Sequence, residues 1–208
     1  MAFFVVFFMM KPVFRHGFFV ISKYNCNFEN MKKILFIIDA QNDFCSRGGS
    51  LVCEHAEAAV DNICRLLETE KFDRIICTLD THGTDYIITK EGLDLPVEHC
   101  QKNTWGFLPN RKIYDALYEP SYEVINKNSF MVKPDDLYNY FDTKTEKYEI
   151  FICGFATDIC VLNNALLIKN TLGQLYDVSA IENCCAGTTA EMHAKAIEIM
   201  KSNFIKIV

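Results

Sequence analysis

Residues 148–169 read YEIFICGFATDICVLNNALLIK, and this stretch decides the fold. Its first part, Tyr148–Cys153, is a short apolar run that predicts a buried strand. A glycine-containing turn follows, and Ile159–Lys169 then has the length and apolar character of a buried helix that ends before Gly173. A strand, a tight turn and a helix in this order place Cys160 in or near the first helical turn.

A cysteine at this position has a chemical use. A thiol in the first turn lies close to unpaired backbone N–H groups and to the positive end of the helix dipole. Both effects lower the pKa of a thiol and favour the nucleophilic thiolate, and the same N–H groups can bind an oxyanion. The alternative is that Cys160 is a small core residue, one of ten cysteines in the chain. The rest of the sequence favours the nucleophile interpretation.

The same alternation of strand-like and helix-like segments continues from Lys33 to the end of the chain. Continuous apolar runs predict further strands at Ile34–Ile38, Arg74–Leu79, Tyr122–Asn126, Leu175–Ala180 and Phe204–Val208. Helical spacing and flanking signals predict further helices at His55–Glu70, Lys112–Tyr118, Pro134–Phe141 and after the capping-box spacing of Thr188–Glu191. Because helix-length crossovers join the strands, we expect a three-layer α/β fold: a mostly parallel six-stranded sheet with helices on both faces.

Residues 1–30 differ from the rest of the chain. Their aromatic-rich run, Ala2–Met10, is shorter than the roughly 20 apolar residues that span a bilayer. No clear signal-peptide cleavage site follows it. We therefore expect residues 1–30 to be an N-terminal extension or a misassigned start that lies outside the core. Residues 31–208, which open at Met31, are expected to form the functional domain.

Composition limits the partners and the compartment of the 208-residue chain. Its net charge of −6 comes without a basic block, which argues against a nucleic-acid partner, and we expect no membrane partner. The cysteines are scattered and lack CxxC spacing, which is typical of a reducing compartment, so we predict a cytoplasmic protein. The adjacent Cys184 and Cys185 are either two small packing residues or a vicinal disulfide with a redox function.

Polar residues follow the predicted strands at the places where sites form in open parallel sheets. Asp39 follows the first strand, Lys127 the third, and the turn ending at Cys160 the fourth. Because carboxyl ends of parallel strands share one edge, we expect these residues to converge. A carboxylate can accept the thiol proton and activate water, a cysteine can form an acyl intermediate, and a cation can hold the carboxylate in place. Singly, each could be an ordinary residue of a strand end or core; together they indicate a thiol hydrolase.

A candidate metal site lies beside this group. Asp80 and His82 follow the second strand, and Glu91 and His99 lie in the irregular section 80–110. Two imidazoles and two carboxylates suit a divalent ion, with zinc expected first and manganese or iron as alternatives. The spacing by itself is a weak signal, and an ordinary polar loop is the other interpretation. The helical residues His55 and His193 are expected to be structural or to lie at the surface.

At this point the sequence resembles the isochorismatase-like cysteine hydrolases, and most closely the nicotinamidases among them. The resemblance covers essentially residues 31–208. The matching segments are Ile38–Phe44 (IDAQNDF), Asp80–His82 (DTH), His99–Cys100, Lys127 and Gly154–Cys160 (GFATDIC).

The resemblance implies specific roles for these residues. Asp39, Lys127 and Cys160 would form a catalytic triad. The peptide bond between Phe155 and Ala156 would be cis, and the N–H groups of Ala156 and Cys160 would face the oxyanion. Phe44 would lie against the substrate ring. The metal ligands that the resemblance implies are Asp80, His82 and His99, with Glu91 as a fourth.

The implied function is nicotinamide hydrolysis to nicotinate and ammonia through a cysteine thioester, a step of NAD salvage. One departure affects the substrate: Leu95 stands before Pro96, where many nicotinamidases have a tryptophan. Another small carboxamide or carbamoyl substrate is therefore the first alternative. A non-catalytic metal- or ligand-binding relative is the second. We expect a small-molecule amide as the partner; relatives are often dimers or larger, so a homo-oligomer stays open.

Overall fold

The computed structural model describes residues 31–117, 122–141, 147–173 and 175–208. These residues form a six-stranded sheet in the order β3-β2-β1-β4-β5-β6, in which every pair of neighbours is parallel. The strands are β1 (Met31–Ile38), β2 (Arg74–Asp80), β3 (Tyr122–Lys127), β4 (Lys147–Phe155), β5 (Asp177–Ala186) and β6 (Lys206–Ile207). The predicted three-layer parallel fold is confirmed. The expected extension, residues 1–30, lies outside the described residues and stays a prediction.

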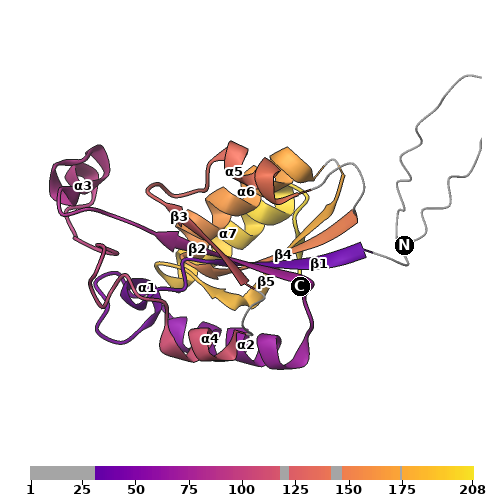
Figure 1. The fold of residues 1–208 in the computed structure, drawn as a ribbon, viewed down its shortest axis with the longest axis horizontal. Helices are drawn as coiled ribbons and strands as arrows, with labels where there is room; N and C mark the ends of the chain where they lie inside the picture. Colours follow the sequence, from indigo (N-terminus) through magenta and orange to yellow (C-terminus); the bar gives the residue numbers. More distant parts are fainter. Residues whose placement is uncertain (1–30, 118–121, 142–146, 174) are drawn as a thin grey trace, which may run out of the picture. The chain divides into compact units, whose positions relative to one another are not determined.

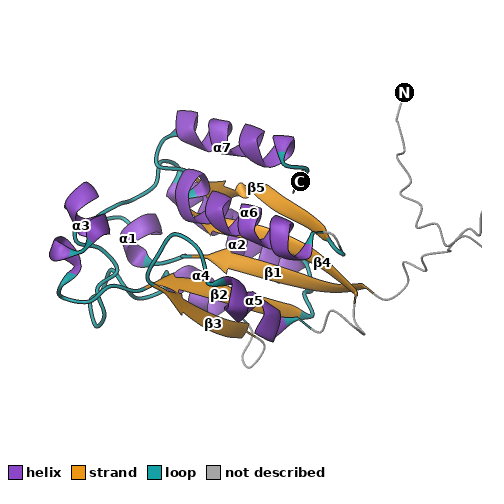
Figure 2. Cartoon of the chain, turned by 90° about the horizontal axis from the view of Figure 1, so that it is seen from above, coloured by secondary structure: helices purple, strands orange, loops and turns teal. Residues whose placement is uncertain are grey.

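Helices cover both faces of the sheet. On one face α2 (Ala56–Thr69) packs against α4 (Arg111–Ala116), and the other face carries α5 (Pro134–Tyr140), α6 (Leu162–Leu172) and α7 (Ala190–Ser202) (Figure 1). The short helices α1 (Asn42–Cys45) and α3 (Lys90–Asp94) lie beyond the carboxyl ends of the strands, as seen from above in Figure 2. Within the described ranges, no helix has the length and apolar character needed to cross a membrane.

The central strands explain why the sequence folds this way. Ile34–Ile38 is buried on both faces, which is why β1 is a continuous apolar run rather than an alternating one. β1 pairs in parallel with β2 and with β4, so its carboxyl end lies beside both of theirs. At the end of β4, Gly154 has φ +124° and lies so close to β1 that a Cβ would come within 2.1 Å of the Ile38 carbonyl oxygen. Only glycine fits this position without displacing the backbone.

Several element boundaries differ from the expected ones. The predicted strand at Leu175–Ala180 continues to Ala186, because the exposed Glu182 and Asn183 interrupt the apolar pattern without ending the strand. Cys184 and Cys185 therefore lie inside β5, both buried and both free thiols. The interpretation as two small packing residues fits these buried thiols, whereas the alternative, a vicinal disulfide between them, is not formed.

Two helix starts also differ. The helix expected at Lys112–Tyr118 begins at Arg111, because the Asn110 side chain caps it, and it is described to Ala116; Tyr118 itself lies outside the described residues. At α7, the capping residue is Thr189, which accepts a hydrogen bond from the N–H of Met192 at 3.1 Å. The predicted capping segment is therefore present, with the cap one residue later than the Thr188–Glu191 spacing indicates.

Candidate active site

The carboxyl ends of β1, β2 and β3 place three charged side chains together. Asp39 follows β1 directly, and Asp80 and Lys127 are the last residues of β2 and β3. The backbone N–H of Asp39 donates to the Thr78 carbonyl at 3.1 Å, and its Oδ1 accepts the Thr78 hydroxyl at 2.6 Å. Asp39 and Lys127 are 0% and 5% exposed, so both charges lie inside the protein. Thr78 holds the Asp39 carboxylate from the neighbouring strand.

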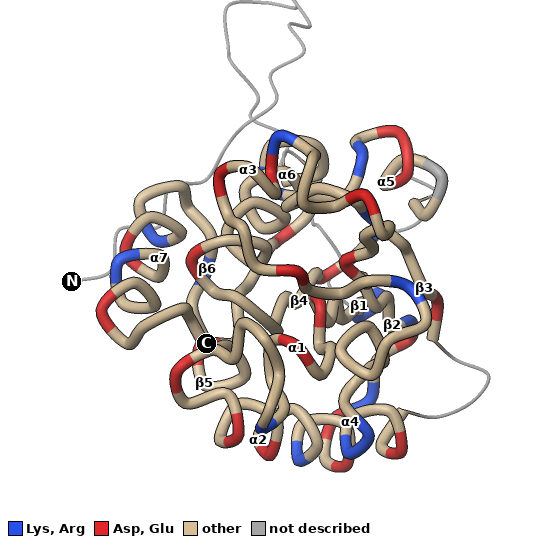
Figure 3. The backbone as a smooth tube through the Cα atoms, turned by 90° about the vertical axis from the view of Figure 1, so that its left-hand side faces the viewer, with Lys and Arg blue, Asp and Glu red and all other residues tan. Residues whose placement is uncertain are grey.

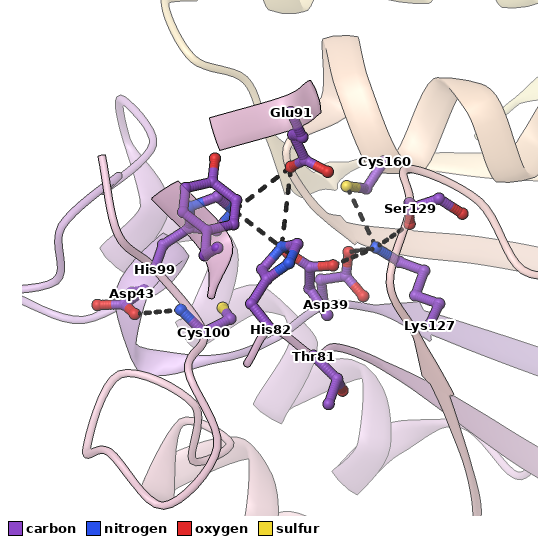
Figure 4. A network of polar contacts seen from close by, with 12 residues as sticks. Asp39, Asp43, Thr81, His82, Glu91, His99, Cys100, Lys127, Ser129 and Cys160 are labelled. Carbon is purple, nitrogen blue, oxygen red and sulfur yellow. Dashed lines mark hydrogen bonds and ion pairs between the residues drawn. The ribbon is translucent and has the colours of Figure 1, made fainter. Parts of the chain in front are cut away.

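The Lys127 ammonium lies at the centre of this group (Figure 4). Its Nζ is 2.6 Å from Asp39 Oδ2, 3.3 Å from Asp80 Oδ1 and 3.5 Å from Cys160 Sγ. It also donates to the Ser129 carbonyl at 2.9 Å. The structure therefore brings together Asp39, Lys127 and Cys160, as the sequence predicted.

One oxygen in this group has spare bonding capacity. Asp39 Oδ2 forms the ion pair with Lys127 but accepts no aligned hydrogen bond from any residue in the described ranges. Buried polar atoms are nearly always hydrogen-bonded in folded proteins. With Lys127 as its partner at 2.6 Å, Oδ2 still keeps a lone pair that can accept a proton.

Cys160 lies in a wide π-helical turn, Thr157–Val161, which joins β4 to α6. The expected lowering of its pKa is wrong. Burial raises the pKa of the Cys160 thiol well above its usual value, the nearby Asp39 raises it further, and Lys127 offsets only part of this. Since desolvation is the largest effect here, the thiol keeps its proton until a base removes it. The peptide bond between Phe155 and Ala156, just before this turn, is cis, as the resemblance implies.

The two charged partners differ in how burial affects them. Burial raises the pKa of Asp39 above its usual value, although Lys127 opposes the shift. Burial alone would lower the pKa of Lys127, but the neighbouring Asp39, Cys160 and Asp80 outweigh it and raise that pKa. Lys127 therefore stays charged, while Asp39 is a stronger base than an exposed aspartate.

A compact set of candidate metal ligands adjoins Asp39, Lys127 and Cys160. The ligand atoms of Asp80, His82 and His99 all lie within 4.8 Å of one another, and the three residues are buried. His99 Nδ1 lies 2.8 Å from the Val97 carbonyl; a proton on Nδ1 would satisfy this contact and leave Nε2 free to bind a metal. This donor set and its geometry fit a divalent ion such as zinc. Glu91 Oε1 is 3.8 Å from Nε2 of both histidines, so it lies at the rim of the set rather than within it.

Aromatic rings line the same side of the site. Phe44 is buried and its ring centroid lies 5.7 Å from that of His99. Tyr86, which the sequence reasoning missed, packs edge-on against His82 at 4.6 Å and against His99 at 4.9 Å. Its hydroxyl donates to the backbone carbonyl of Leu95 at 2.9 Å. Phe44 thus lies beside a candidate metal-ligand histidine, and its contact with a substrate ring stays a prediction. The half-buried Leu95 meets Tyr86 through its main-chain carbonyl.

Two side chains of the IDAQNDF segment hold the segments that carry the candidate metal ligands. The Gln41 amide accepts from the N–H of Asp80 at 2.7 Å and donates to the Asp80 carbonyl at 2.9 Å. Asp43 Oδ2 accepts from the N–H of Cys100, next to His99, at 2.7 Å. Sequence reasoning quoted both residues as part of a motif without assigning these roles.

Figure 3 views the molecule from the end where the site lies and shows acidic and basic residues interspersed.

Known proteins are similar to this chain in fold and in sequence. The family model of the isochorismatase domain matches residues 33–208. A nicotinamidase of Saccharomyces cerevisiae is 28% identical over 174 residues, which cover 64% of this chain and 80% of the yeast protein. A nicotinamidase structure from Bacillus subtilis has a TM-score of 0.70 at 25% identity and covers 86% of this chain and 99% of its own. A Pyrococcus horikoshii pyrazinamidase, solved in complex with zinc, has a TM-score of 0.65 at 27% identity. The match covers 85% of this chain and 98% of the pyrazinamidase chain.

Fold, site and relatives together define a class of protein. The chain belongs to the isochorismatase family, and it is an amidohydrolase of that family. Within the family, its resemblance is to the nicotinamidases.

Proposed function

We propose that this protein is a zinc-dependent nicotinamidase that hydrolyses nicotinamide to nicotinate and ammonia. The observation that carries the proposal is the buried Lys127 ammonium, in reach of Asp39 and Cys160 and next to the Asp80–His82–His99 set. The names of the yeast and Bacillus subtilis relatives support nicotinamide as the substrate.

The first half of the proposed reaction forms a thioester. Asp39 takes the thiol proton on Oδ2, the carboxylate oxygen that Lys127 holds in place, and the sulfur of Cys160 attacks the carboxamide carbon. The N–H groups of Ala156 and Cys160 are the proposed donors to the resulting oxyanion. The C–N bond then breaks, and ammonia leaves with the proton that Asp39 held. Lys127 keeps the carboxylate oriented and offsets the negative charge throughout.

The second half releases the acid. Asp39, again ionised, takes a proton from water, and the resulting hydroxide attacks the thioester carbonyl. The S–C bond breaks, and the sulfur recovers its proton from Asp39. The sum is one amide and one water converted to one acid and one ammonia, with the protein unchanged.

Asp80, His82 and His99 are the proposed zinc ligands, with Glu91 as a fourth. Bound there, zinc would supply a Lewis acid for the pyridine nitrogen of the substrate. Phe44 would lie against the substrate ring, and Tyr86 would keep both imidazoles in place. The decisive assay measures ammonia release from nicotinamide, with and without added zinc. If the folded, zinc-loaded protein releases none, this substrate assignment is wrong.

A second substrate class has one specific support. Leu95 stands before Pro96, where the resemblance leads us to expect the tryptophan of many nicotinamidases, so the proposed pocket wall would differ there. A panel of small carboxamides and carbamoyl compounds tests this alternative in the same assay. A kcat/KM at least about tenfold higher for one of them than for nicotinamide would favour the alternative.

Metal binding should depend on individual ligands. We expect His82→Ala to lose bound zinc on dialysis, and Glu91→Gln to weaken zinc binding by about tenfold, because the rim carboxylate contributes less than an inner ligand. The measurement is zinc content after equilibrium dialysis at graded free zinc. The exposed His55 provides the control, since His55→Ala should bind zinc as the wild type does. Unchanged zinc affinity in Glu91→Gln would exclude Glu91 as a ligand.

The acid side of the pH profile should report on Asp39. Asp39 accepts a proton only when ionised, and its pKa is raised above 3.8, so activity should fall at a higher pH than an ordinary aspartate would dictate. In the zinc-saturated enzyme, we expect the midpoint of the acid limb of the kcat/KM profile to lie above pH 3.8. Zinc content is measured at each pH, so that metal loss is not mistaken for protonation. A midpoint at or below pH 3.8 would contradict the assignment of Asp39 as the base.

A further inference from the structure

The amino-terminal end of α7 is hydrogen-bonded to the turn that carries Cys160. The hydroxyl of Thr157, the first residue of this turn, lies 2.8 Å from Nδ1 of His193 on α7. The next residue, Asp158, accepts from the backbone N–H of Thr188 at 2.8 Å and from the Thr188 hydroxyl at 2.6 Å. Two consecutive residues at the start of the turn are thus held by one helix end.

This helix end is itself anchored. The Glu54 carboxylate accepts from the N–H of Ala190 at 2.6 Å, and the Glu54 N–H donates to the Gly187 carbonyl at 3.0 Å. Gly187 packs so closely that a Cβ there would lie 2.8 Å from Asp158 Oδ1 and 2.9 Å from the Cβ of His193. The start of α7 is therefore a fixed support rather than a loose neighbour.

The Thr157–His193 contact is the less exposed half of this connection, with a buried threonine and a half-buried histidine. Thr157 is 0% exposed, whereas the Asp158–Thr188 contacts lie at the surface. Thr157 directly follows Ala156, whose carbonyl accepts two backbone hydrogen bonds of the turn. Because Thr157 is fully buried, water competes less for this hydrogen bond than for the exposed ones, so it holds its partners more firmly. His193, which the sequence reasoning assigned to a structural or surface role, thus fixes the first residue of the nucleophile turn.

We propose that His193 is a positioning residue for the reaction. Acting through Thr157, it holds the turn that keeps Cys160 Sγ 3.5 Å from Lys127 Nζ. Neither His193 nor Thr157 touches the reacting atoms. Displacing a reacting group by about 1 Å can cost roughly 100-fold in rate, so a loosened turn would slow the chemical step. The inference rests on the proposed function in one respect: it takes Cys160 as the nucleophile.

Paired substitutions test this role. Thr157→Val and His193→Leu remove the hydrogen bond, whereas Thr157→Ser and His193→Asn keep a polar group at the same place, because the asparagine amide occupies the position of Nδ1. We expect the Val and Leu variants to lose about 10- to 100-fold in kcat, with KM changed by less than about twofold. The Ser and Asn variants should stay within about threefold of wild type. His193→Gln, whose amide lies nearer the position of Nε2, should behave as His193→Leu does.

A second readout does not depend on the substrate. The rate at which iodoacetamide alkylates Cys160, followed by mass spectrometry of its peptide, should fall in the Val, Leu and Gln variants and be kept in the Ser and Asn variants. Zinc content should stay at the wild-type level in all of them, whereas a merely structural role would lower zinc content and thermal midpoint together with activity. If the Val or Leu variant does not fold, the comparison of His193→Asn with His193→Gln decides.

Two results would overturn the proposal. One is a folded His193→Leu or Thr157→Val variant with wild-type kcat and alkylation rate; the other is a His193→Asn variant as impaired as His193→Leu. A wild-type protein that releases ammonia from no amide would refute the proposed function instead. In that case the alkylation rates alone still decide whether His193 positions Cys160.

Discussion

Replacing Cys160 with alanine is expected to lower kcat for amide hydrolysis by about 10⁴-fold or more, because the thioester can no longer form. The measurement is ammonia release from nicotinamide by the zinc-loaded variant. Cys160 is nearly fully buried and small, so its replacement by alanine should leave the fold and the zinc content unchanged. Cys64→Ala, at a half-buried cysteine of α2 outside the site, is the matched control and should keep wild-type activity.

The result for Cys160→Ala separates the competing accounts. Loss of activity in this variant alone supports a cysteine hydrolase. If Cys160→Ala hydrolyses the amide at a rate comparable with wild type, the thioester route is wrong. If both proteins are folded, hold zinc and hydrolyse no compound in an amide panel, the chain is a non-catalytic relative.

Asp39→Asn should have the second-largest effect. The amide cannot accept the thiol proton, so we expect kcat to fall by about 10³- to 10⁴-fold while zinc content is kept. The substitution removes one charge beside the buried Lys127, but Asp80 remains 3.3 Å from its ammonium and keeps it paired. Thermal unfolding should therefore show a folded variant. Asp61→Asn, at an exposed carboxylate on α2, is the matched control for loss of one negative charge.

The pH dependence of Asp39→Asn adds a sharper criterion. If Asp39 is the base, its removal should also abolish the acid limb of the wild-type profile in whatever activity remains. A variant that keeps wild-type kcat, or that keeps the acid limb unchanged, would show that another group accepts the proton.

Much of the fold and of the triad could be predicted, because both follow from backbone rules. The apolar run of Ile34–Ile38 predicts a buried parallel strand, and parallel strands bring their carboxyl ends to one edge. That rule places Asp39 and Lys127 together although they are far apart in sequence, and the structure has their charged atoms 2.6 Å apart. The second half of β5 was missed because Glu182 interrupts the apolar pattern that marked its first half.

Other parts of the site could not be predicted because they depend on three-dimensional burial. The direction of the pKa shift of Cys160 is set by desolvation, which no local pattern of residues reveals. Tyr86 lies in an irregular section without periodicity, so nothing in the sequence indicated that its ring packs on both histidines. His193 looks like an ordinary helix residue until the structure shows its Nδ1 2.8 Å from the Thr157 hydroxyl.

The covalent intermediate offers the most direct test of the central claim, that Asp39, Lys127 and Cys160 together cleave an amide through a thioester. The zinc-loaded protein is mixed with nicotinamide, quenched in acid during turnover and digested, and the peptides are analysed by mass spectrometry. The account predicts a nicotinoyl group on the peptide that contains Cys160, absent in Cys160→Ala. Steady release of ammonia without any acyl group on Cys160, under conditions that preserve a synthetic thioester standard, would contradict it.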